Sequence, residues 1–149
     1  MINPTMSSSL STWETRTRWL GLVYGITFVI AGLIFVLAPD YLTVGLDRLG
    51  QILFGTPVRL LPDGPPERFW LALTTSMMAN ISVISFLVWR DVKRFKLLMI
   101  PLLVSKLTSS IMGLAFYFGA AHYFSHLVIF ATDFPLFVVG TVFYVKIRE

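Results

Sequence analysis

Two residues of opposite charge stand inside long apolar stretches of this sequence. Lys106 lies in the apolar run from 97 to 123, and Asp133 lies in the run from 124 to 145. A charge at the centre of a membrane-spanning helix costs roughly 3 kcal/mol on insertion scales, so such residues are paired or functional. Lys106 and Asp133 are therefore the first candidates for chemistry.

The order of the residues predicts that these two charges meet. A turn at 119–122 folds the two runs into an antiparallel hairpin, in which Lys106 and Asp133 lie nearly equally far from the turn. At ~1.5 Å per residue, both fall near the middle of a hydrocarbon core ~30 Å thick. We interpret them as a structural ion pair. Two alternatives stay open: a proton or ion relay with Asn80, predicted at a similar depth, and contact with a headgroup, a quinone or a partner subunit.

Two histidines form the second group of candidate residues. His122 and His126 are four positions apart, so on a helix they share one face. No Asp, Glu or Cys beside them completes a metal site, and we predict none. Either imidazole is an alternative ligand for a haem or a chlorophyll-type pigment, although the pair cannot ligate one haem from opposite faces.

No other part of the sequence indicates catalysis. The 149 residues contain no cysteine, which excludes disulfides, thiolate metal sites and thiol catalysis. There is no glycine-rich phosphate loop, no zinc-protease motif and no nucleophile elbow. We therefore expect a protein that is not an enzyme and has no obligatory cofactor.

Composition places the chain in a membrane. Apolar residues make up 56% of it and charged residues only 13%, which is too apolar for a soluble domain of this size. The formal net charge of +4 comes from residues that flank the apolar runs, so we predict no nucleic-acid binding. We expect a single all-α domain with four transmembrane helices, at about 19–38, 69–89, 97–121 and 124–145.

The connection between the first two spans predicts a further helix. Leucines at 42, 46, 49 and 53 recur at helical spacing with polar residues between them, which indicates an amphipathic helix in the interface. Prolines and a glycine from 57 to 66 then break regular structure. Residues 1–15 are rich in Ser and Thr, and we expect them to be weakly structured.

Glycines on the first span predict close helix packing. Gly21, Gly25 and Gly32 share one face, and the first two have the spacing that lets another helix approach closely. We interpret this face as packing within the bundle, with an intermolecular contact as the alternative.

The distribution of basic residues predicts the orientation. Lys and Arg flank the first span on its N-terminal side, fill the segment 90–96, and follow the last span. The positive-inside rule therefore predicts that both termini and the segment 90–96 lie in the cytoplasm.

One stretch resembles a known family. The first-span run 25–32, Gly-Ile-Thr-Phe-Val-Ile-Ala-Gly, closes at Ala38-Pro39, and with the four-helix layout it resembles the DoxX-like group of small bacterial membrane proteins. The resemblance implies a link to respiratory or redox complexes, and it transfers no functional residue.

These expectations combine into one functional hypothesis. We expect a non-catalytic subunit of a larger, bioenergetic complex in a bacterial cytoplasmic membrane, in contact with bound lipid and with other membrane subunits. The alternatives are a small proton-coupled transporter that uses Asn80, Lys106 and Asp133, and a pigment- or haem-binding subunit that uses His122 or His126.

Overall fold

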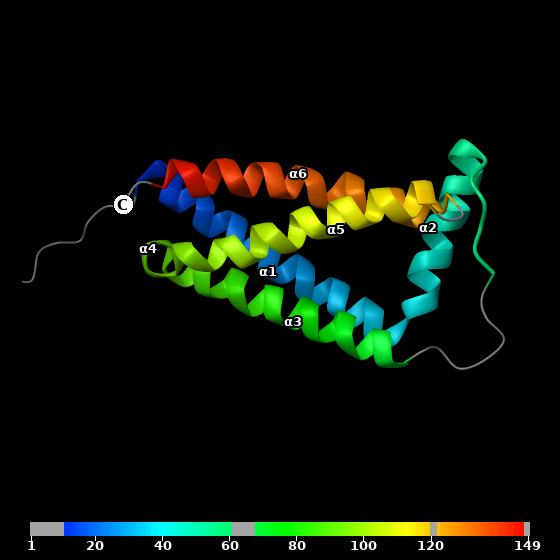
Figure 1. The fold of residues 1–149 in the computed structure, drawn as a ribbon. Helices are drawn as coiled ribbons and strands as arrows, with labels where there is room; N and C mark the ends of the chain where they lie inside the picture. Colours follow the sequence, from blue (N-terminus) through cyan, green and yellow to red (C-terminus); the bar gives the residue numbers. More distant parts are fainter. Residues whose placement is uncertain (1–10, 61–67, 120–121, 148–149) are drawn as a thin grey trace, which may run out of the picture.

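The computed structural model describes residues 11–60, 68–119 and 122–147, and every regular element in these ranges is helical. The predicted all-α polytopic fold is confirmed, because four helical stretches are long and apolar enough to cross a membrane. Figure 1 shows them side by side along one direction. The elements are α1 (Thr12–Leu37), α2 (Pro39–Phe54), α3 (Arg68–Arg90), α4 (Val92–Phe95), the 3-10 turn η1 (Lys96–Leu98), α5 (Met99–Gly119) and α6 (Phe124–Lys146).

The first span begins earlier than predicted. Ser11 and Glu14 form a capping box, in which the Ser11 hydroxyl accepts a hydrogen bond from the Glu14 N–H and Glu14 Oε2 accepts one from the Ser11 N–H. These bonds give hydrogen-bond partners to backbone N–H groups that have none at an uncapped helix end. The expectation of weak structure up to residue 15 is therefore wrong for 12–15, while residues 1–10 lie outside the described part.

The spans form two tightly packed pairs, α1 with α3 and α5 with α6. Glycines allow the close approach of α1 to α3. A Cβ added at Gly21 would lie 2.9 Å from the Ser85 carbonyl oxygen, and one at Gly25 would lie 2.8 Å from the Phe86 ring. The interpretation of this face as packing within the bundle is confirmed.

A small core joins the two pairs. Tyr24 and Phe28 of α1 are buried with Ile81 of α3 and Leu102 of α5. The Tyr24 hydroxyl donates a 2.7 Å hydrogen bond to the Leu136 carbonyl of α6. This bond gives the buried phenol a partner and links α1 to α6.

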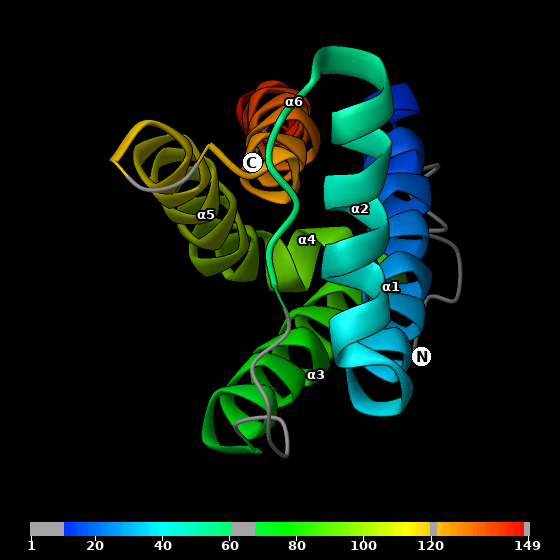
Figure 2. The same ribbon diagram turned by 90° about the vertical axis from the view of Figure 1, so that its right-hand side faces the viewer.

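The predicted interfacial helix is α2, which begins with Pro39 after a single connecting residue, Ala38. It lies across one end of the bundle and runs from α1 towards α6 (Figure 2). Leu49 and Leu53 are exposed, as expected for a face turned to lipid. The helix ends at Phe54 and is capped by Gly55, whose φ of 68° is in the left-handed region that glycine tolerates. Of the residues predicted to break the structure, Pro62, Gly64, Pro65 and Pro66 lie outside the described ranges.

Candidate functional site

The predicted contact between Lys106 and Asp133 is present. Lys106 Nζ on α5 lies 2.9 Å from Asp133 Oδ1 on α6. The two side chains are 4% and 14% exposed, respectively. Neighbouring positions of the α5–α6 hairpin therefore bring the charges together as an enclosed ion pair.

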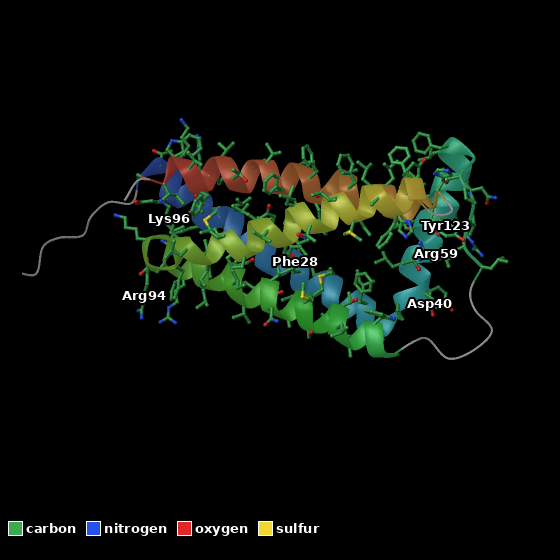
Figure 3. The ribbon with its side chains drawn as sticks, viewed as in Figure 1. Phe28, Asp40, Arg59, Arg94, Lys96 and Tyr123 are labelled. Carbon is green, nitrogen blue, oxygen red and sulfur yellow. The ribbon has the colours of Figure 1, made fainter. Side chains whose placement is uncertain are left out.

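Other side chains complete the surroundings of this pair. The Ser109 hydroxyl donates to Asp133 Oδ2, so both carboxylate oxygens accept a hydrogen bond. Lys106 Nζ also lies 4.0 Å from the centroid of the Phe28 ring on α1, a cation–π contact that stabilises a desolvated ammonium. Figure 3 shows Phe28 midway along the bundle. The ion pair is thus held by three helices.

Asn80 does not join this pair. Its side chain is exposed on α3, and within the described ranges it has no hydrogen bond to Lys106 or Asp133. The buried residues of α3 include Ile81, Ser85 and Val88, which recur at helical spacing and contact neighbouring helices. Asn80 therefore belongs to the outward side of the helix, and the predicted three-residue cluster is reduced to two.

The two histidines do not share a helical face. His122 precedes α6 and has a φ of 53°, in the left-handed region, whereas His126 lies in the first turn of the helix. The His122 ring contacts Tyr117, and the His126 ring contacts Phe116 and Tyr123. Among residues 11–60, 68–119 and 122–147, no group of three His, Asp or Glu side chains is placed to hold a metal ion.

A second ion pair lies at the α2 end of the bundle, and sequence reasoning missed it. Asp47 of α2 is fully buried, and its Oδ2 lies 2.8 Å from Arg59 Nε. Its Oδ1 accepts a 2.9 Å bond from the Ser125 N–H in the first turn of α6. Asp47 thereby acts as an N-terminal cap from another helix, where a negative charge is favourable.

Besides its ion pair with Asp47, Arg59 contacts residues at the start of α6. Its Nη2 donates a 2.6 Å bond to the Ser125 hydroxyl, and its guanidinium lies 4.8 Å from the centroid of the Tyr123 ring. Figure 3 shows Arg59 beside Tyr123 at this end. Burial alone raises the pKa of Asp47, but the hydrogen bonds from Arg59 and Ser125 outweigh it and lower the pKa below the ordinary 3.8.

Close backbone packing surrounds this second pair. A Cβ added at Gly50 would lie 2.1 Å from Phe124 Cβ. Because glycine has no side chain, the backbone of α2 can pack directly against Phe124 at the start of α6. The Phe54 and Phe124 rings are 5.4 Å apart. The one sequence signal for this arrangement is that Asp47 and Gly50 lie three positions apart, on one side of α2.

The opposite end of the bundle is basic. It holds the start of α1, the short helix α4 and the end of α6 (Figure 1). Lys96 Nζ donates a 2.8 Å bond to the Ile147 carbonyl, and Arg18 Nε donates one of 2.8 Å to the Trp89 carbonyl. These cations satisfy carbonyl groups at the ends of α6 and α3.

Comparisons with protein-family models, with curated proteins and with solved structures found no match for this chain.

Proposed function

We propose that the protein is a non-catalytic subunit of a larger membrane assembly, and that the outward face of α3 binds a helix of another subunit. The observation that carries this proposal is the position of Asn80. Its amide is exposed near the middle of a helix long and apolar enough to span a membrane. In the part of the chain that the structure describes, this amide has no hydrogen-bond partner.

A primary amide in hydrocarbon needs such a partner. Leaving an amide without a hydrogen bond in an apolar environment costs roughly 2–7 kcal/mol, depending on the reference state. In membranes, Asn side chains form hydrogen bonds between helices that contribute roughly 0.6–2 kcal/mol. A polar group on a neighbouring spanning helix would satisfy the Asn80 amide and remove the penalty.

The neighbours of Asn80 fit a helix. Ser76 and Ala79 are exposed and small, so a second backbone can come close. Met77 and Val83 are 53% and 58% exposed and flank the amide with apolar surface. The face therefore offers one polar contact surrounded by apolar packing area.

We assign Lys106 and Asp133 a structural role in this subunit. Asp133 receives a hydrogen bond at each oxygen, and the Lys106 ammonium contacts both the carboxylate and the Phe28 ring. A pair with these partners stabilises the contact of α1, α5 and α6. Proton-coupled transport by Lys106, Asp133 and Asn80 has less support, because Asn80 faces outward.

The proposed location is a bacterial cytoplasmic membrane with both termini in the cytoplasm. The support is that the basic segments of the chain gather at the end of the bundle that holds the start of α1 and the end of α6. A bioenergetic assembly is proposed from the resemblance to DoxX-like proteins.

The test compares Asn80→Leu with Thr132→Val after purification in mild detergent. Thr132 is also exposed on a spanning helix, but its hydroxyl bonds to the Val128 carbonyl of its own helix. Native mass spectrometry should show the wild type and Thr132→Val bound to a second membrane protein at fixed stoichiometry, and Asn80→Leu free of it. Circular dichroism checks that both variants are folded. A wild-type monomer, or an assembly that Asn80→Leu leaves intact, contradicts the proposal.

A further inference from the structure

The basic end of the bundle contains a cavity of about 690 Å³. Its wall includes Lys93, Lys96 and Lys146, together with Trp13, Glu14 and Ile147. The volume lies within the range of about 300–1,000 Å³ that small-molecule sites occupy. The lining residues come from the start of α1, the α3–α5 connection and the end of α6, so folding is needed to bring them together.

Among the described residues of this wall, one carboxylate is present, and it is already engaged. Glu14 is buried, its Oε2 accepts the Ser11 N–H at 2.7 Å, and its Oε1 lies 3.4 Å from Lys93 Nζ. Glu14 therefore neutralises at most one of the three lysines.

The other two ammonium groups are not paired with a carboxylate of the described residues. Lys96 Nζ bonds the neutral Ile147 carbonyl and lies 5.2 Å from the centroid of the Tyr144 ring. Lys146 is exposed. No carboxylate of the described residues pairs with either lysine, so the cavity wall has an excess of positive charge.

We propose that this cavity binds a phosphate-bearing anion, either the headgroup of an anionic phospholipid or a soluble phosphate compound. Lysines are point-charge ligands for phosphate, and basic pockets between spanning helices bind anionic headgroups. The cavity lies where the spans end, which is where we expect the phosphates of a surrounding bilayer, and Trp13 is an aromatic residue of the kind that occupies this boundary. This site does not depend on the proposed assembly.

A substitution at Lys146 can test the cavity without disturbing the fold. Lys146→Gln removes a charge from an exposed side chain that forms no ion pair with another described residue. Arg94→Gln is the matched control, because Arg94 is an exposed cation at the same end but is not part of the cavity wall. Figure 3 shows Arg94 and Lys96 at this end. Circular dichroism and thermal unfolding in detergent confirm that each variant is folded.

Calorimetric titration of the full chain in detergent uses three probes: short-chain phosphatidylglycerol, short-chain phosphatidylcholine and inorganic pyrophosphate. We expect phosphatidylglycerol or pyrophosphate to bind, phosphatidylcholine to bind more weakly, and Lys146→Gln to weaken anion binding about fivefold, as one lysine near an anionic surface does. Arg94→Gln should leave binding within twofold of wild type.

The probes distinguish the source of the phosphate. Binding of phosphatidylglycerol alone assigns the site to a lipid headgroup, and binding of pyrophosphate assigns it to a soluble phosphate compound. Absence of binding by both anions overturns the proposal. Equal weakening by Lys146→Gln and Arg94→Gln also overturns it, because the attraction would then be a property of the whole basic end and not of the cavity.

Discussion

Two of the ion pairs among the described residues, Lys106–Asp133 and Asp47–Arg59, differ in depth and in which partner is withdrawn from the surface. At mid-span, the cation Lys106 is 4% exposed and the anion Asp133 is 14% exposed. At the α2 end, the anion Asp47 is fully buried while Arg59 is 27% exposed. The mid-span pair is held within the membrane-spanning part of the bundle, whereas Arg59 reaches the molecular surface at the end of the spans.

The difference shows how each pair stabilises the fold. Lys106 and Asp133 depend mainly on each other, with single contributions from Ser109 and Phe28. Arg59 instead uses its planar group to contact Asp47, Ser125 and the Tyr123 ring together, which suits it to joining segments. We therefore expect the fold to lose much stability when one partner of the mid-span pair, Lys106–Asp133, is removed. Removing one partner of the outer pair, Asp47–Arg59, should cost the fold less.

The largest effect is expected for Asp133→Asn. This change leaves the Lys106 ammonium desolvated without its counter-charge, and breaking a buried pair in this way costs about 3–5 kcal/mol. The double variant Lys106→Met with Asp133→Leu removes both charges and should retain most of the wild-type stability. Denaturant titration in detergent micelles, followed by circular dichroism, measures both free energies of unfolding. A double variant less stable than Asp133→Asn contradicts the structural role of the pair.

A smaller loss is expected for Asp47→Asn. The amide keeps one acceptor oxygen but loses the charge that binds Arg59 and the start of α6, at a cost of about 1–3 kcal/mol. The Arg59 side chain is 27% exposed, so water can solvate its guanidinium when the Asp47 charge is lost. The same denaturant titration should rank this variant above Asp133→Asn in stability. The reverse order would show that the outer pair is the more enclosed of the two.

Ser109→Ala tests the second oxygen of Asp133. The substitution leaves Oδ2 without its hydroxyl donor while the ion pair to Lys106 remains, so we expect a loss of about 1–2 kcal/mol. The matched control is Ser76→Ala, because the Ser76 hydroxyl donates to the Leu73 carbonyl of its own helix. If both variants have the same unfolding free energy, the hydroxyl bond to Asp133 contributes nothing measurable.

The smallest effect is expected from mild acid. The pKa of Asp47 is lowered in the folded protein, so its contribution is complete above the ordinary value of 3.8 and is lost as pH falls through the lower folded value. Wild-type unfolding should therefore become easier below about pH 4, and Asp47→Asn should show less of this change. Thermal unfolding between pH 3 and pH 6 measures the difference. Identical pH profiles would exclude Asp47 as its source.

Much of the fold could be predicted from the sequence. Long uncharged runs mark the spans because hydrocarbon excludes charges, and the geometry of an antiparallel hairpin is enough to pair Lys106 with Asp133. The early start of α1 could also have been predicted, since Ser11 and Glu14 have capping-box spacing.

Other parts of the candidate site could not be predicted. The depth of Asn80 along its helix can be predicted from the sequence, but the direction of its side chain cannot. That direction depends on which side of α3 packs against α1, and the close contacts at Gly21 and Gly25 determine this side. The contact of Asp47 with Ser125 joins residues 78 positions apart. No periodic pattern links them, because the contact depends on how α2 turns across the bundle.

That turn of α2 has a consequence for how the molecule sits in a bilayer. A helix that lies along the surface and is joined to a span through Ala38 alone, while Asp47 holds it to a distant span, limits how far the whole bundle can sink or tilt. When a bilayer is thinner than the spans, tilting is the usual response, and because α2 opposes tilting, we expect the surrounding lipid to thicken instead. We therefore expect the membrane around this protein to adapt its thickness to the bundle.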